Sequence, residues 1–211
     1  MGLRERKAQR NRERILNEAL ALFRKNGYEP TTMESIAGAA ELSPSTLYRY
    51  FPTKDSIILA PFRTFSDRFS EIFAKHSAHH PVGEALAEAI FALAQTGEEH
   101  AEETLLVRSI IDQSPTARAR LWDYVYAQQE ELSRLIAQRL HAKEDDLRVV
   151  FTARLALTIY GLAADWWRAS GGKKASRSTA EELMRLLEAG EIAFPRAPKK
   201  RARTKQAAIA G

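Results

Sequence analysis

The stretch TTMESIAGAAELSPSTLYRYFPTKDSIILA, residues 31–60, decides the fold. Thr31 and Glu34 have the spacing of a capping box, in which two side chains close the first turn of a helix. We therefore expect a short helix to begin here. The dipeptide Glu41-Leu42 then makes a tight turn.

A second short helix follows the turn. Ser43 is a favoured N-cap residue, and Pro44 suits the first helical position because its missing N–H has no partner there. Pro52 ends the helix. Residues 10–25, which place apolar side chains at helical spacing, supply a longer helix upstream. Three helices with a tight turn between the last two predict a helix-turn-helix.

The apolar residues of the two short helices have sizes that suit close packing of one helix against the other. Ala37 and Ala40 keep the first short helix thin, and Leu47 and Phe51, four residues apart, anchor the second to the core. Their burial turns polar side chains outward, where they are able to bond phosphates and base edges. These side chains are Ser45, Thr46, Tyr48, Arg49 and Tyr50.

Residues 10–60 resemble the DNA-binding domain of the tetracycline-repressor (TetR) family. The matching positions are Thr31, Thr32, Ile36, Ala37, Ala40, Ser43, Leu47, Tyr48, Phe51 and Lys54. The resemblance implies a homodimer that regulates transcription, with recognition helices in successive major grooves about 34–36 Å apart. Its expected partners are a palindromic double-stranded DNA operator and a small hydrophobic effector that releases it, so we expect a repressor. A cytoplasmic location is expected by default, because the charged amino terminus does not look like a secretory signal.

The same resemblance assigns roles to single residues. Phosphate contacts fall to Thr32, Tyr48, Tyr50 and Lys54, and base contacts to Pro44, Ser45, Thr46 and Arg49. The sequence departs from the family at three positions, since Gly is frequent where Glu41 and Ser45 stand, and His is common in place of Tyr50. A positive φ at Glu41 would cost on the order of 1 kcal/mol.

A basic arm precedes the first helix and comprises Arg4, Arg6, Lys7, Arg10, Arg12 and Arg14. Contact with phosphates or the minor groove is favoured for the three arginines that adjoin the fold. For residues 4–7 a solvated, frayed terminus explains the charges equally well.

The rest of the chain is predicted to be helical. The predicted helices span residues 54–75, with a kink at Pro61, and then 81–95, 98–113, 115–141, 144–170 and 178–192. The fold class is therefore all-α, with about nine helices. We expect an arm and DNA-binding domain at residues 1–54, with its motif at about 33–51, a ligand-binding and dimerisation domain at 55–194, and a disordered basic tail at 195–211.

Aromatic residues of the second domain are candidates for an effector pocket. Residues 114–194 weakly resemble the branch of the family that binds acyl-coenzyme-A-like ligands, with Arg108 a candidate to neutralise an anionic head. Ordinary core packing explains each aromatic side chain as well, and Arg108 could instead pair with Asp112. The candidate walls are Phe62, Phe65, Phe69, Phe91, Trp122, Tyr126, Tyr160 and Trp166.

Two helices of the second domain are candidates for dimerisation, since the family usually pairs its last two helices with their twins. Small faces suited to close contact and a leucine stripe favour this arrangement. The residues are Ala156, Ile159, Gly161, Ala163, Ala164, Leu183, Leu186 and Leu187.

Charge and composition limit the alternatives. The net charge of +5 divides into +4 for residues 1–54, −5 for 55–194 and +6 for 195–211. A protein that compacts DNA without regard to sequence would be basic throughout, so operator recognition is favoured. The basic tail has the composition of a nuclear import signal, although a solubilising tail with non-specific DNA affinity is the simpler interpretation.

Other functions find little support in the sequence. The chain has no cysteine, and we find no catalytic motif, secretory signal or membrane-spanning run, so neither an enzyme nor a membrane protein is expected. We predict no cofactor. His76, His79 and His80 could hold zinc, but they equally suit a helix C-terminus, and no metal site is assigned.

Overall fold

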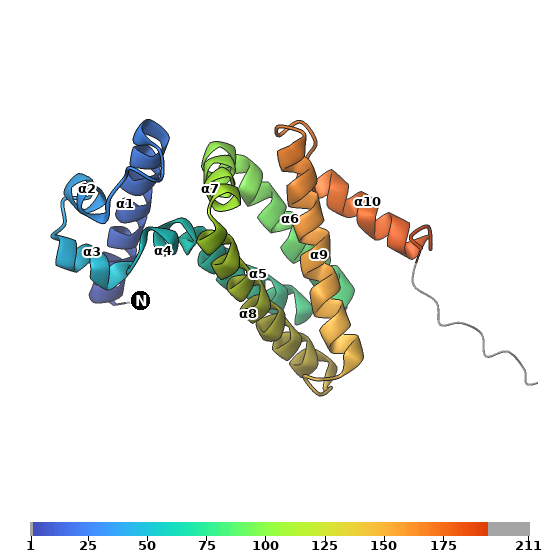
Figure 1. Ribbon diagram of the computed structural model, residues 1–211. Helices are drawn as coiled ribbons and strands as arrows, with labels where there is room; N and C mark the ends of the chain where they lie inside the picture. The colour runs from blue at the N-terminus through green and yellow to red at the C-terminus, as the bar shows by residue number, and fades with distance from the viewer. Residues whose placement is uncertain (1, 194–211) are drawn as a thin grey trace, which may run out of the picture.

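The computed structural model describes residues 2–193 and shows an all-α protein in which the described residues form no strand (Figure 1). The predicted tail at residues 195–211 lies outside the described residues. The helices are α1 (Leu3–Asn26), α2 (Met33–Ala39), α3 (Pro44–Tyr50), α4 (Lys54–Ile58), α5 (Ala60–Ser77), α6 (Val82–Glu99), α7 (Ala101–Gln113), α8 (Pro115–Leu140), α9 (Leu147–Ala169) and α10 (Ser176–Glu188).

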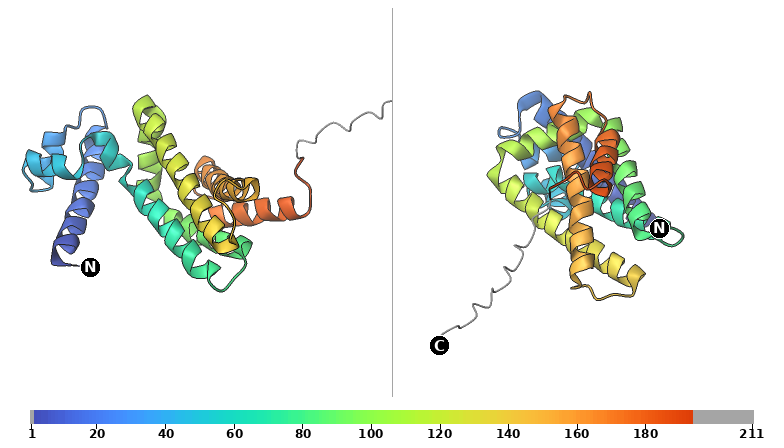
Figure 2. Two further views of the ribbon diagram at one scale, coloured as in Figure 1. Left: turned by 90° about the horizontal axis from the view of Figure 1, so that it is seen from below. Right: turned by 90° about the vertical axis from the view of Figure 1, so that its right-hand side faces the viewer.

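Two separate hydrophobic cores organise these helices, and Figure 2 shows the corresponding two groups of helices along the molecule. The amino-terminal core joins α1–α4 to α7 and to the start of α8 through Val107, Ile110, Ile111 and Ala117. The carboxy-terminal core is built from α5, α6, α8, α9 and α10. The helix-turn-helix unit therefore shares its core with two helices of the second half, which gives the two halves a packed connection.

The helix predicted over residues 54–75 is divided at Leu59, which brings the described helices to ten. Pro61 lies in the first turn of α5, where its missing N–H costs nothing. In a continuous helix the proline ring would crowd the carbonyl of Ile57. The proline thus ends one helix and starts the next, where we had expected a kink.

Several helix starts differ from the prediction because other side chains provide the caps. Thr32, rather than Thr31, caps α2, and its hydroxyl accepts a hydrogen bond from Ser35 N. The α9 helix begins at Leu147 with Asp146 as its cap, and hydrogen bonds from Arg148 lower the pKa of Asp146 to about 2. Residues 4–7, for which a frayed terminus was one of two interpretations, belong to α1.

The turn between α2 and α3 requires the unusual backbone that we anticipated for Glu41. Its φ is +52°, in the left-handed region that favours glycine. The carboxylate lies 3.6 Å from Arg14, but the Glu41 side chain is 85% exposed, so this ion pair adds little. The Glu41 backbone is therefore strained locally, and the strain is maintained by the packing of α2 against α3.

Replacing Glu41 with glycine is expected to raise the free energy of unfolding by up to about 1 kcal/mol, since glycine adopts positive φ without a steric penalty. Valine, whose branched Cβ tolerates this region worst, should lower it by at least about 1 kcal/mol. Thermal unfolding followed by circular dichroism measures both changes. Glutamine keeps the backbone strain but removes the charge, so a large loss in E41Q would contradict the explanation.

The α9 helix has the length and apolar composition of a membrane span, which the sequence analysis did not anticipate. It is also a core helix, because Val149, Ala153, Ala156 and Ala163 are buried in the carboxy-terminal core. A core helix of a folded bundle passes the same length and composition test. Packing against α6, α8 and α10 therefore explains the apolar residues on the buried side of α9.

Candidate nucleic-acid interface and effector region

The recognition helix α3 is held in place at both ends. At its start the Ser43 hydroxyl accepts a hydrogen bond from Thr46 N (3.3 Å) and donates one to Thr46 Oγ1 (2.9 Å). Leu47 is fully buried and Phe51 is 6% exposed, as predicted, and both belong to the amino-terminal core. One face of α3 is thus fixed to the protein, which leaves the opposite face free.

The polar residues predicted to contact DNA lie on or beside this free face, with different exposure. Thr32, Pro44, Ser45, Tyr48 and Arg49 are exposed. Thr46, Tyr50 and Lys54 are half-buried. Their roles towards phosphates and bases stay predictions.

Tyr50 is held by α1 in a way that the sequence did not reveal. Asn11 Nδ2 donates a hydrogen bond of 3.0 Å to the Tyr50 hydroxyl. The guanidinium carbons of Arg12 and Arg49 lie 5.6 Å and 5.7 Å from the centre of the Tyr50 ring, within cation–π range. The ring therefore supports the side chain of Arg49 and draws Arg12 towards the same surface.

Replacing Tyr50 with leucine is expected to weaken operator binding about threefold to tenfold, because Arg49 loses an interaction of roughly 1 kcal/mol that orients it. Tyr50→Phe keeps the ring and should retain most of the affinity. Fluorescence anisotropy with a labelled operator measures both variants. Equal losses in the two would indicate that the hydroxyl, and not the ring, matters.

Tyr48 is exposed but already has a partner. Its hydroxyl donates a hydrogen bond of 3.1 Å to Glu34 Oε1 on α2, and this bond raises the pKa of Tyr48. To donate a hydrogen bond to a DNA phosphate, the Tyr48 hydroxyl first has to give up its bond to the Glu34 carboxylate. The hydrogen bond meanwhile ties the middle of α3 to α2.

Lys54 lies apart from the exposed face of α3. Its ammonium donates hydrogen bonds to the carbonyls of Tyr28 (2.8 Å) and Glu29 (3.0 Å), and it lies 4.5 Å from the centre of the Tyr28 ring. Burial and the bond to Asp55 raise the pKa of Tyr28. Two of the three donors of Lys54 are thus used within the protein, so a phosphate contact has to share or release them.

The candidate effector residues do not form one group. Phe65, Phe69 and Tyr160 pack together between α5 and α9, and the Phe65 and Tyr160 rings lie 4.5 Å apart. Burial raises the pKa of Tyr160 to about 12. Phe91 also borders the carboxy-terminal core, whereas Phe62 packs against the amino-terminal core. We call Phe65, Phe69 and Tyr160 the aromatic cluster.

Three of the predicted wall residues lie on the outside of the chain. Trp122 and Tyr126 are 71% and 58% exposed, and Trp166 is 54% exposed. The α8 helix turns the opposite face inward, with Leu132 in the carboxy-terminal core. These three exposed residues therefore do not line the interior with the others. They could not be told apart in the sequence, because the helical spacing of aromatic residues does not show which face of a helix meets the core.

Arg108 connects two helices. Its guanidinium lies 3.6 Å from Asp165 on α9, while the expected partner Asp112 pairs with Arg168 at 3.2 Å. Burial and the nearby Arg168 lower the pKa of Arg108. The side chain of Arg108 is 26% exposed, so the ion pair is moderately shielded from water. The network fastens α7 to α9 close to the aromatic cluster, because Arg108 also affects the pKa of Tyr160.

The small residues expected at a dimer interface are largely used inside the chain. Ala156, Ile159 and Ala163 are 4%, 8% and 0% exposed and belong to the carboxy-terminal core. The exposed apolar residues of α9 lie elsewhere, in what we call the α9 stripe. It comprises Leu147, Phe151, Leu162 and Trp166, which are 83%, 58%, 40% and 54% exposed.

The histidines at the end of α5 do not gather into a metal site among residues 2–193, where no three metal-binding side chains come together. The His76 and His80 rings lie 6.2 Å apart, and His80 Nδ1 is 3.5 Å from Glu84. The contact between His80, in the loop after α5, and Glu84, in the first turn of α6, explains the position of His80.

A helix-turn-helix seated by Leu47 and Phe51, with an exposed arginine on its second helix, defines the class as a DNA-binding protein of the helix-turn-helix type. Residues 15–60 match the family described as "Bacterial regulatory proteins, tetR family". Residues 15–60 are therefore a TetR-type DNA-binding segment, and the chain is a transcriptional regulator similar to members of the TetR family.

Three similar proteins indicate how far the likeness extends. TcmR of Streptomyces glaucescens is 44% identical over 68 residues, which are 32% of this chain and only 30% of TcmR. UidR of Escherichia coli K12 is 28% identical over 167 residues, 75% of this chain and 82% of UidR. The structure of Thermus thermophilus FadR, a TetR-family repressor in complex with lauroyl-CoA, is 26% identical with a TM-score of 0.60, covering 89% of this chain and 98% of FadR.

Proposed function

We propose that this chain is a homodimeric, ligand-responsive repressor that binds a palindromic operator through α3 and leaves it when a hydrophobic effector enters the carboxy-terminal half. The observation that carries the proposal is the exposed Arg49 on a short helix fixed by the buried Leu47. Cytoplasmic location accompanies this function.

The aromatic cluster is the best-supported site for the effector. Its three rings pack against one another in the carboxy-terminal half, so an acyl chain that enters there has to displace them. The α5 helix follows α4 directly at Leu59, and Ile57, Ile58 and Leu59 belong to the amino-terminal core. A movement of α5 is therefore passed to the helices that carry α3. The effector shifts the balance from the DNA-bound to the released conformation only by the difference between its affinities for the two.

An acyl-CoA-like effector is supported by the likeness to FadR, whose structure holds lauroyl-CoA. Arg108, close to Tyr160, supplies a positive charge for an anionic head group, although it is now paired with Asp165. An anionic ligand would compete with Asp165 for the guanidinium. Its binding would thus loosen the link between α7 and α9.

Gln128 adds a polar group to the interior. The residue is 7% exposed, and its Nε2 has no hydrogen-bond partner within the described residues. It lies on α8 between Tyr124, which packs against the amino-terminal core, and Leu132 of the carboxy-terminal core. A buried donor without a partner costs about 1–3 kcal/mol. We infer that an effector with a hydrogen-bond acceptor relieves this cost.

Replacing Gln128 with leucine is expected to raise the free energy of unfolding without ligand by about 1 kcal/mol, because the unpaired donor disappears. The same variant should lose part of its stabilisation by lauroyl-CoA. Thermal unfolding with and without the ligand measures both. Gln138→Leu, on the exposed side of the same helix, is the matched control. An unchanged ligand response in Q128L would contradict a role for this amide.

Dimerisation is supported by the α9 stripe, whose apolar side chains have no cover in the single chain. Successive half-sites of an operator lie about 34–36 Å apart, which requires two copies of α3 held by a common axis. A contact between two α9 helices supplies such an axis, because a two-fold interface uses the same surface on both copies.

The test of this function combines footprinting and ligand titration. Protection of a short palindrome in the DNA flanking the gene, removed by lauroyl-CoA but not by coenzyme A alone, is the expected result. Uniform protection of the whole fragment would favour DNA compaction and overturn the proposal. A ligand that stabilises the protein against heat yet leaves the footprint unchanged would separate sensing from DNA release.

A further inference from the structure

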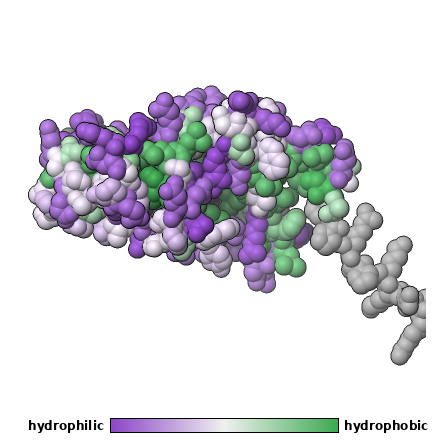
Figure 3. Space-filling model, turned by 45° about the horizontal axis from the view of Figure 1, so that its top comes forward, coloured by the Kyte–Doolittle hydropathy of each residue, from purple (hydrophilic) through white to green (hydrophobic). Residues whose placement is uncertain are grey.

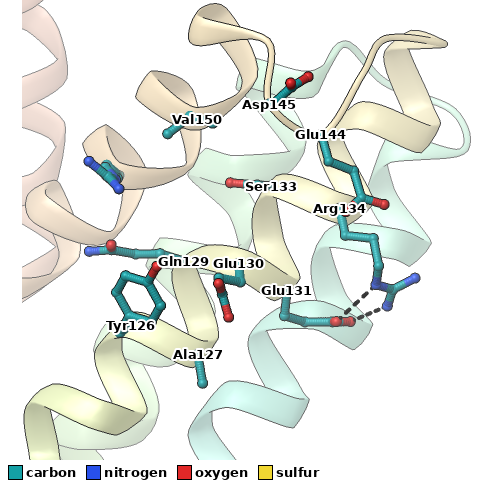
Figure 4. A pocket seen from close by; sticks show the side chains of 11 residues that line it. Tyr126, Ala127, Gln129, Glu130, Glu131, Ser133, Arg134, Glu144, Asp145 and Val150 are labelled. Carbon is teal, nitrogen blue, oxygen red and sulfur yellow. Dashed lines mark hydrogen bonds and ion pairs between the residues drawn. The ribbon is translucent and has the colours of Figure 1, made fainter.

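A pocket of about 630 Å³ lies apart from the aromatic cluster, between the second half of α8, the α8–α9 loop and the first turns of α9 (Figure 4). Its volume is in the range of sites that hold a small molecule or a peptide segment. Acidic residues dominate its charge. They are Glu130, Glu131, Glu144 and Asp145.

Half of this negative charge is not offset by arginines in the lining. Arg134 donates two hydrogen bonds to the carboxylate of Glu131, at 3.1 Å and 2.5 Å, so these two charges cancel. Glu130, Glu144 and Asp145 form no ion pair within the described residues. Arg154 is the remaining cation in the lining. The pocket thus carries an excess of negative charge and favours a cationic occupant.

Ser133 provides a second, independent indication of an occupant. The residue is 8% exposed, and Figure 4 shows its side chain at the pocket between α8 and α9. Ser133 forms no side-chain hydrogen bond with another group of residues 2–193, and its hydroxyl opens on the pocket, where it is available to bond to an occupant.

We propose that the basic tail of the same chain, residues 196–205, docks in this acidic pocket. Residues 195–211 contain six basic side chains and no acidic one. The Tyr126 side chain, at the pocket and 58% exposed, offers a ring face to a guanidinium. The charges of tail and pocket are therefore complementary.

The connection through the chain also favours the tail over a free cation. The described structure ends at Ala193, after α10, which packs along α9. The nine residues from 194 to Ala202 reach up to roughly 32 Å when extended. That is close to the length of α9, roughly 34 Å for its 23 residues. A tethered segment has an effective concentration in the millimolar range, well above that of most soluble competitors.

Docking would make the pocket compete with DNA for the basic tail. A free tail adds six positive charges to the sequence-independent attraction for phosphate. A docked tail has at most half of these charges offset by Glu130, Glu144 and Asp145. The pocket therefore lowers non-specific binding and leaves the contacts of α3 unchanged. This consequence does not depend on the identity of the effector.

Disulfide cross-linking of the full chain tests the proposal, since the natural sequence has no cysteine. One variant carries Ala127→Cys at the pocket and Ala202→Cys in the tail; its control pairs Ala74→Cys, on the exposed side of α5, with Ala202→Cys. We expect the pocket pair to form a bond within one chain about tenfold faster than the control pair. Equal rates, or bonds only between chains, would overturn the proposal.

Charge dependence provides the second measurement. Glu130→Gln, Glu144→Gln and Asp145→Asn together should remove most of the rate advantage, as should about 1 M salt, where the Debye length is roughly 3 Å. Asp67→Asn, Glu71→Gln and Glu88→Gln, at exposed positions away from the pocket, form the matched control and should leave the rate unchanged. Circular dichroism confirms that both triple variants fold. Stabilisation by spermidine without any cross-link would assign the pocket to a soluble cation and overturn the role of the tail.

Discussion

Replacing Arg49 with alanine is expected to lower affinity for the specific operator by about tenfold to a hundredfold, while affinity for unrelated DNA falls much less. A bidentate contact between arginine and guanine contributes about 1–3 kcal/mol of discrimination. Arg49 is exposed on the free face of α3, and the Tyr50 ring limits the positions of its guanidinium. Little conformational entropy is then lost when the contact forms.

Competition binding with operator and scrambled duplexes at fixed salt measures this change. Arg63→Ala is the matched control, because Arg63 is exposed on α5, away from α3, and the described residues give it no ion pair. A pure phosphate contact would weaken both duplexes equally and reduce the salt dependence by about one charge. Equal loss on both duplexes in R49A would therefore place Arg49 on the backbone of the DNA and not on a base.

The helix-turn-helix was predictable because its decisive interactions are local. Ser43 and Pro44 fix where α3 begins, and the separation of Leu47 from Phe51 fixes which face is buried. The positive φ of Glu41 could also be anticipated, since a turn this tight leaves few other backbone choices. These features depend on neighbours within about four residues.

The support of Tyr50 could not be predicted in the same way. Asn11 and Tyr50 are 39 positions apart in the chain, and no spacing rule connects them. The link follows from the packing of α1 beside α3, which only the folded chain provides. The signal was a departure from the family, a tyrosine where histidine is common, whose cause became clear from the contacts with Arg12 and Asn11.

The carboxy-terminal half was predicted as helices but not in its packing. Apolar residues occur on more than one side of α8 and α9, so periodicity does not tell the core side from an exposed side. Figure 3 shows hydrophobic surface reaching the outside of this half. Ala156 and Ile159 were expected at a dimer contact and lie inside, whereas Trp122 and Trp166 were expected inside and lie outside.

Replacing both Phe151 and Leu162 with aspartate in one variant is expected to convert the dimer into a monomer and to reduce operator affinity by about a hundredfold or more. On a helix that turns 100° per residue, Leu147, Phe151, Leu162 and Trp166 fall within an arc of about 100°. They form an apolar stripe along α9, interrupted by the exposed Thr158, that the other described residues leave uncovered. Two such stripes packed together exclude water from about the side-chain area of eight large residues.

The loss of affinity follows from separating the two recognition helices. In a dimer the second α3 binds its half-site as an intramolecular step, which raises affinity by about 10²–10⁴ over one half-site. Gel filtration should show a mass near 24 kDa in place of about twice that value. Trp122→Asp with Tyr126→Asp, on the exposed side of α8, is the matched control, since it adds the same charge to an apolar surface outside the stripe. If F151D/L162D stays dimeric while the α8 control variant becomes monomeric, the dimer interface lies on α8 and not on α9. A buried interface does not tolerate an unpaired charge, whereas a surface in contact with water does.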